Sequence, residues 1–155
     1  MLKSLAVAKE KWGGADNLID QWLVHRGNLL AGYCELANLP PYEQEQRQLP
    51  DLAQIGKFCA LLVDYVSEGH FGVYNEVVSA CETNGQCNIE LARKLMPQIA
   101  KTTDFALDFH DKYTAMTSHN ELINLDEELS KLGQVLESRF ALEDKLLEAV
   151  YLIKN

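Results

Sequence analysis

Apolar residues recur at alternating spacings of three and four along most of the chain, which is the pattern of amphipathic α-helices. The first such stretch runs from Asp16 to Leu39 and stops before Pro40 and Pro41, which cannot continue a helix. After a polar loop, a second stretch begins at Asp51, whose carboxylate is a suitable N-cap. No convincing period-two alternation, the signature of half-buried strands, competes with these patterns. The sequence therefore predicts an all-α fold.

Three further helical stretches complete the pattern. A short one covers residues 71–82 and ends in the turn sequence TNGQC. A long one follows Asn88, a candidate N-cap, and continues to about Met116, with a kink expected at Pro97. The last runs from about Asn120 to Ile153. The inward-facing positions expected on the two long helices are Leu91, Leu95, Ile99, Phe105 and Phe109, then Leu122, Leu125, Leu129, Leu132, Leu136, Leu146, Val150 and Ile153.

Four long helices with such stripes are typical of an antiparallel, up-and-down helical bundle, here with short extra helices. The chain has 155 residues, of which 47% are hydrophobic. This length and composition suit one globular domain spanning residues 1–155. The sequence contains no internal repeat and no low-complexity tract that would indicate a second unit.

The formal net charge of −9 affects the choice of partner more than the fold. An acidic surface repels phosphate backbones, so we expect no direct nucleic-acid binding, whereas a basic protein partner would be attracted. Solubility alone is the other explanation of the charge. No run of 18 apolar residues and no export signal is found, so we expect a cytoplasmic protein with no membrane contact.

The residues that commonly carry catalysis or bind metals form no known arrangement in this sequence. The four cysteines, Cys34, Cys59, Cys81 and Cys87, lack the close pairs of a zinc site, and we expect reduced thiols. No histidine has a glutamate three positions earlier, as a di-iron bundle requires, and no phosphate-binding loop or nucleophile elbow is found. We therefore expect no enzyme, no metal and no cofactor.

Three charged residues interrupt the apolar stripes of two helices. Continuing the three-four repeat places Arg26 between Trp22 and Leu29, and places Arg139 and Glu143 between the leucines of the last helix. Charges at such positions are costly unless they are paired and hydrogen-bonded. One interpretation is a buried ionic network, here called the polar seam, that fixes helix register. The other is a polar cavity or partner surface.

The polar seam also allows an alternative function. His25 lies beside Arg26 in the helical segment VHRGNLLAG, so a phosphorelay or small-molecule-binding module on a helical bundle is conceivable. The histidine phosphotransfer family places a Lys-Gly pair three residues after its histidine, whereas Arg26 and Gly27 follow His25 directly. This alternative is therefore poorly supported by the sequence.

The segment LLVDYVSEGHFGVY, residues 61–74, carries polar residues on the side opposite its core face. On a helical wheel, Asp64, Ser67 and Phe71 fall within about 60° of each other, with Glu68 nearby. An aromatic side chain rimmed by acids suits the anchoring of a basic partner. Alternatively, a loop covers Phe71, or Gly69 ends the helix and turns Phe71 inward. The expected core face consists of Ile55, Phe58, Leu62, Tyr65 and Val66.

Three stretches of the chain closely resemble the regulator of sigma D family, which includes the alginate regulatory protein. They are WGGADNLIDQWLVHR (12–26), FCALLVDYVSEGHFGVY (58–74) and LGQVLESRFALEDKL (132–146), in the family's order. The resemblance implies a helical bundle without enzymatic activity that binds the primary sigma factor, chiefly its region four, with region two a further candidate contact. It also implies that sigma is kept from RNA polymerase core and promoters, which favours alternative sigma factors in stationary phase.

The resemblance also bears on individual residues. The family's sigma-contact positions correspond to Asp64, Ser67 and Phe71 of this chain, and the wheel adds Glu68. These four residues are here called the docking face. Region four is a helix-turn-helix domain that meets DNA phosphates with basic side chains, so an acidic surface can occupy them in place of DNA.

Overall fold

The computed structural model describes residues 17–40, 42, 50–69, 74–75, 79 and 88–150. Its elements are the helices α2 (Asn17–Leu36), α3 (Leu52–Glu68), α5 (Ile89–Thr114) and α6 (Leu125–Val150). A 3₁₀-helix, η2 (His119–Asn124), connects α5 to α6. All regular secondary structure in the described residues is helical, which confirms the all-α prediction.

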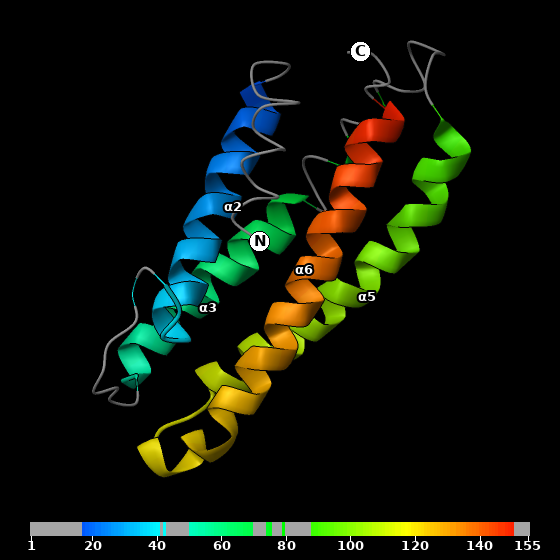
Figure 1. Ribbon diagram of the computed structural model, residues 1–155. Coiled ribbons are helices and arrows are strands. Elements are labelled where there is room, and N and C mark those ends of the chain that lie inside the picture. The colour runs from blue at the N-terminus through cyan, green and yellow to red at the C-terminus, as the bar shows by residue number, and fades with distance from the viewer. Residues whose placement is uncertain are drawn as a thin grey trace.

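The helices pack in sequence order along the chain. Figure 1 shows α2 descending and α3 returning at an angle beside it, while α5 and α6 run side by side in opposite directions. α3 also packs against α5, which joins the two pairs. One hydrophobic cluster receives buried side chains from all four helices, among them Trp22, Leu62, Ile99 and Leu136. The apolar stripes of the sequence therefore meet in a shared core.

The start of α3 follows the predicted capping chemistry. The Asp51 side chain accepts a hydrogen bond from the Gln54 backbone N–H at 2.7 Å, and the Gln54 side chain accepts one from the Asp51 N–H at 3.0 Å. This reciprocal capping box satisfies two donors that a helix N-terminus otherwise leaves unpaired. Asn88 caps α5 in the simpler way, by accepting from Leu91 N–H at 3.1 Å. The helix then continues across Pro97 to Thr114.

Helix α2 ends at Leu36, three residues before the predicted end, because Asn38 adopts the left-handed conformation with φ 57°. The Leu39 N–H donates to the Cys34 carbonyl at 2.8 Å, and the Asn38 N–H donates to the Glu35 carbonyl at 3.3 Å. This is the Schellman arrangement, in which a left-handed residue closes the helix. The two prolines that follow prevent its resumption.

Other predicted boundaries and orientations need correction. The last helix begins at Leu125 rather than near Asn120, because residues 119–124 form η2. Leu91, predicted to face inward, is 38% exposed, because the buried stripe of α5 begins one position later, at Ala92, and continues through Leu95. Phe105 is partly buried and packs against the core, in agreement with its predicted inward orientation. Most of the predicted 71–82 helix, and residues 151–153, lie outside the described residues.

Gly133 on α6 allows a close approach by α2. The Tyr33 hydroxyl of α2 donates a hydrogen bond to the Leu129 carbonyl at 2.8 Å, and its ring lies over Gly133. A Cβ atom added at Gly133 would lie 2.2 Å from the Tyr33 Oη atom and 2.8 Å from Cζ. The absence of a side chain at this position is therefore required for the observed α2–α6 contact.

Replacing Gly133 with alanine is expected to lower the free energy of unfolding by about 1–2 kcal/mol, because overpacking outweighs the roughly 1 kcal/mol gained in helix propensity. The matched control is Gly56→Ala in α3, where an added Cβ meets nothing within 4 Å. That variant should gain up to about 1 kcal/mol. Urea denaturation of both variants measures the difference, and stabilisation by both would contradict the close contact.

Candidate functional site

The described part of the docking face lies on the last two turns of α3. Ile55, Phe58, Leu62, Tyr65 and Val66 are buried, as predicted for the core face. On the other side Asp64 is exposed, while Ser67 and Glu68 are partly exposed. Phe71 lies outside the described residues. The structure thus brings three of the four predicted contact residues to one end of α3.

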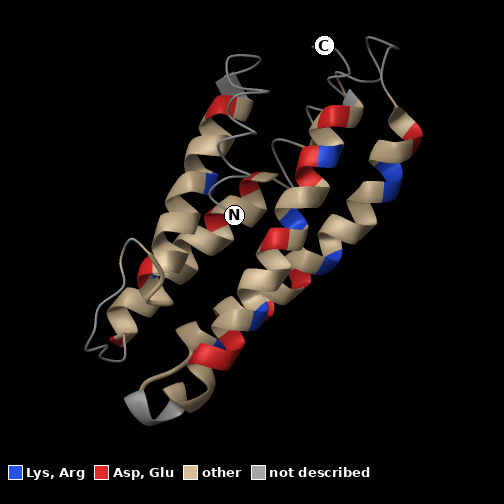
Figure 2. Cartoon of the chain, viewed as in Figure 1, with Lys and Arg blue, Asp and Glu red and all other residues tan. Residues whose placement is uncertain are grey.

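The second half of α3 is acidic. No lysine or arginine follows Lys57 in the helix, whereas Asp64 and Glu68 stand one turn apart, as the red segments of α3 in Figure 2 indicate. Asp64 makes no ion pair within the described residues. Glu68 is paired with the Nδ1 atom of His25, which reaches it from α2. Of the two acids of the face, Glu68 is therefore already in contact with a side chain of α2, whereas Asp64 has no such partner within the described residues.

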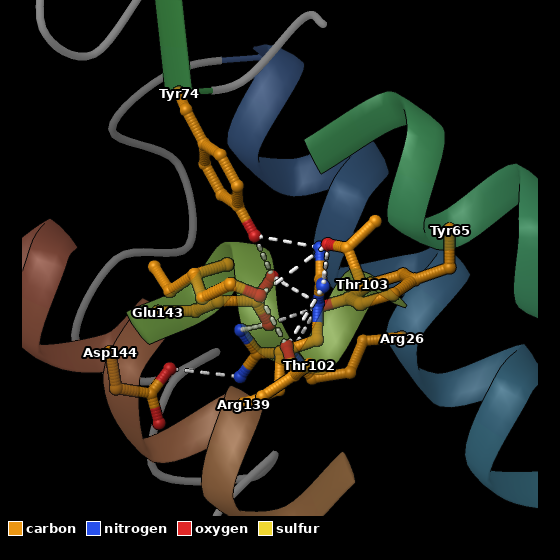
Figure 3. A network of polar contacts seen from close by, with 9 residues as sticks. Arg26, Tyr65, Tyr74, Thr102, Thr103, Arg139, Glu143 and Asp144 are labelled. Carbon is orange, nitrogen blue, oxygen red and sulfur yellow. Dashed lines mark hydrogen bonds and ion pairs between the residues drawn. The ribbon is translucent and has the colours of Figure 1, made fainter. Parts of the chain in front are cut away.

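The polar seam is a buried network centred on Glu143 (Figure 3). Glu143 and Arg139, both of α6, are 0% exposed, and Arg26 of α2 is 1% exposed. Glu143 Oε1 accepts a hydrogen bond from the Tyr65 hydroxyl at 2.7 Å and lies 3.4 Å from Arg26 Nη2. Glu143 Oε2 accepts from the Tyr74 hydroxyl and, at 3.2 Å, from Arg139 Nε. One carboxylate thus satisfies two tyrosines and two guanidinium groups.

Arg139 extends the network to α5. Its Nη1 atom donates to Thr103 Oγ1 at 2.6 Å and to Thr102 Oγ1 at 3.1 Å, and its Nη2 atom donates to the Tyr74 hydroxyl at 3.0 Å. The Thr102 hydroxyl in turn donates to the Ile99 carbonyl at 2.6 Å, and the Thr103 hydroxyl donates to the same carbonyl at 3.4 Å. The guanidinium donors are therefore distributed over acceptors on three segments of the chain.

Arg26 is held by both charge and aromatic rings. Its Nη1 atom lies 2.9 Å from Asp144 Oδ1, and its Nε atom donates to the Tyr65 hydroxyl at 2.9 Å. Its guanidinium carbon lies 5.0 Å from the centre of the Trp22 ring and 4.9 Å from that of Phe140. These are distances at which cation–π attraction operates. Two arginines and the carboxylates of Glu143 and Asp144 leave the cluster electrically balanced.

The surroundings keep the arginines charged and the tyrosines protonated. Burial acts to lower the pKa of Arg26, but the oxygens of Tyr65, Glu143 and Asp144 outweigh it and raise that pKa. Arg139 follows the same pattern. Burial raises the pKa of the Tyr65 and Tyr74 hydroxyls well above the usual value, and the negative charge of Glu143 adds to the effect. Both hydroxyls are therefore donors toward Glu143.

Sequence reasoning identified three members of this network and missed the others. Arg26, Arg139 and Glu143 lie together, as the ionic-network interpretation predicts. His25 is not part of it, since its side chain is 49% exposed and contacts Glu68. The structure therefore separates His25 from the three charged residues with which the phosphorelay or small-molecule alternative would combine it. The missed members are Tyr65, Tyr74, Thr102, Thr103 and Asp144.

The missed members carry a weak signal in the sequence. Tyr65 was assigned to the core face as an apolar ring, although a buried tyrosine hydroxyl normally requires a hydrogen-bond partner. Thr102 and Thr103 follow Ile99 at helical spacing, on the side of α5 that meets the core. Arginines on two apolar stripes require several polar partners, but the sequence does not indicate which residues of other segments these are.

The described residues offer no metal site and no membrane span. No group of three histidine, cysteine or carboxylate side chains within them could hold an ion. No described helix is long and apolar enough to cross a bilayer. Cys34 and Cys59 are buried free thiols, and burial raises the pKa of Cys59 to about 11. Cys81 and Cys87 lie outside the described residues.

Comparison with known proteins assigns the chain to a family. Residues 1–151 match the family model described as "Regulator of RNA polymerase sigma(70) subunit, Rsd/AlgQ". Proteins named "Regulator of sigma D" from Salmonella paratyphi B and Salmonella schwarzengrund are each 35% identical to this chain over 152 residues. The match covers 97% of this chain and 92% of each relative. The resemblance of the three sequence stretches is thereby confirmed: the chain belongs to the Rsd/AlgQ family of regulators of the RNA polymerase sigma(70) subunit.

Proposed function

We propose that this chain is an anti-sigma factor, which binds the primary sigma factor and sequesters it from RNA polymerase core and promoter DNA. The family match over residues 1–151 and the similarity to proteins named "Regulator of sigma D" support this function. It is a regulatory role that requires a binding surface rather than a catalytic group. Region four of sigma is the principal target, and region two is a further candidate contact.

The observation that carries the choice of region four is the acidic end of α3. Asp64 is exposed and has no ion pair within the described residues, and Ser67 and Glu68 stand beside it. A helix-turn-helix domain offers lysine and arginine side chains that otherwise contact DNA phosphates. An acidic helix end can pair with them, and Phe71 then supplies the apolar anchor.

The organisation of the whole chain is compatible with this role. The four helices form one antiparallel, up-and-down bundle that presents Asp64, Ser67 and Glu68 at one end of α3, and residues 1–155 act as a single domain. The protein acts in the cytoplasm, where RNA polymerase works. By lowering the amount of available primary sigma factor, it favours alternative sigma factors in stationary phase.

Isothermal titration calorimetry of the full chain into purified primary sigma factor, and separately into its isolated region four, tests the proposal. Binding of both with the same stoichiometry is expected. Absence of binding to the whole sigma factor would overturn the anti-sigma function. Binding to the whole factor without binding to region four would move the target to another region.

Asp64→Lys is expected to slow association with region four by about tenfold at low salt, because a steering attraction becomes a repulsion. The rate should also depend less on salt as the Debye length falls from about 10 Å to about 3 Å. Stopped-flow association at several salt concentrations measures both effects. The control is Glu137→Lys on α6, an exposed acid whose replacement makes the same change to the net charge of −9. Equal rates for the two variants would place Asp64 outside the interface.

A further inference from the structure

The contact between His25 and Glu68 lies at the interface between α2 and α3. Gly32 of α2 faces Leu61 of α3, since a Cβ at Gly32 would lie 3.2 Å from Leu61 Cδ1. His25 stands two turns before Gly32, and Glu68 stands two turns after Leu61, so the two contacts belong to one antiparallel register. Asp64 lies between Leu61 and Glu68 on the same side of α3. The His25 side chain therefore borders the docking face.

The chemistry of this contact restrains one of the two acids. An ionised carboxylate can only accept hydrogen bonds, so Nδ1 of His25 is the donor to Glu68. Glu68 is 22% exposed and is turned toward α2, whereas Asp64 is exposed and has no ion pair within the described residues. Because both belong to the last two turns of α3, an approaching basic side chain meets one available carboxylate and one that is already engaged.

We infer that His25 is a positioning residue of the docking face, which holds the Glu68 carboxylate against α2 and so withholds it from a basic partner. This role rests on the proposed binding of region four. Two free carboxylates one turn apart would attract any lysine- or arginine-rich surface. Engaging one of them lowers this general attraction and leaves selection to Asp64, Ser67 and the apolar anchor. His25 thus sets the affinity of the face below the value that its charges alone would give.

Calorimetric titration of the full chain with purified region four of the primary sigma factor tests this role. His25→Ala is expected to bind about two- to fivefold more tightly than wild type at low salt. This is the range for one exposed ion pair, here the pair that the released Glu68 carboxylate forms with a basic side chain of region four. The gain should shrink as salt rises. It should also vanish in the Glu68→Gln background, because no carboxylate is then released. His25→Lys places a hydrogen-bond donor beside Glu68 that can hold the carboxylate in the same way, and should bind no more tightly than wild type.

The outcomes separate this inference from the proposed function. Wild-type protein that does not bind region four would remove the proposed target, whatever the variants do. If wild type binds, unchanged or weaker binding by His25→Ala overturns the role of His25, as does a gain that persists in the Glu68→Gln background. Gln21→Ala, an exposed neutral position one turn earlier on α2, is the matched control and should bind as wild type does.

Discussion

Replacing Glu143 with leucine is expected to lower the free energy of unfolding by about 4 kcal/mol, because the loss of one partner leaves buried charge uncompensated. Glu143 accepts from Tyr65, Tyr74 and Arg139 and pairs with Arg26, and at 0% exposure it has no contact with bulk solvent. The added apolar area of leucine cannot offset two guanidinium groups that lose an acceptor. Urea denaturation followed by circular dichroism gives the value.

The matched control for this variant is Glu137→Leu on the same helix. Glu137 is exposed, and the substitution is chemically identical, so a change within about 0.5 kcal/mol is expected. Glu143→Gln should fall between the two, because the amide keeps one acceptor but loses the charge. A Glu143→Leu variant within about 1 kcal/mol of wild type would mean that the network contributes far less than buried pairs of this kind usually do.

Phe71→Ala is expected to weaken binding to sigma region four by about 2 kcal/mol, close to a thirtyfold rise in Kd, if Phe71 is the central apolar anchor. Aromatic residues at the centre of an interface commonly carry such energies because their pockets are fully desolvated. Titration calorimetry measures the change. The thermal unfolding of the variant establishes separately that it is folded.

Ile123→Ala provides the control for loss of exposed apolar area. Ile123 is 87% exposed in η2, at the far end of the helices from the acidic end of α3 (Figure 1). Its truncation should leave the affinity unchanged, since it lies outside the docking face. Wild-type affinity in a folded Phe71→Ala variant would show that the anchor lies elsewhere.

The sequence was sufficient for what depends on local periodicity. The three-four spacing gave the four long helices and the core face of α3, and capping residues gave the starts of α3 and α5. It also showed that Arg26, Arg139 and Glu143 interrupt apolar stripes. Each of these features is determined by neighbours within two turns of a helix.

The rest depends on contacts between distant segments. Arg26 and Asp144 are separated by 118 positions, and Tyr74 and Arg139 by 65, so no local pattern pairs them. The early end of α2 was missed because an asparagine can adopt the left-handed conformation but rarely must. The engagement of Glu68 by His25 was missed because a wheel describes one helix and the partner lies on another.

The charge balance of the buried network also constrains how this chain can diverge. A hydrophobic interior of the same shape could be as stable, since replacing a whole buried ionic cluster with apolar residues is often neutral or favourable. Reaching it by single substitutions passes through intermediates with an unpaired buried arginine or glutamate, each destabilised by about 3–5 kcal/mol. That is a large part of the roughly 5–15 kcal/mol that keeps a domain folded. The arrangement of Arg26, Arg139, Glu143 and Asp144 is therefore expected to persist among descendants because the intermediate steps are inaccessible, whether or not the network is the most stable interior.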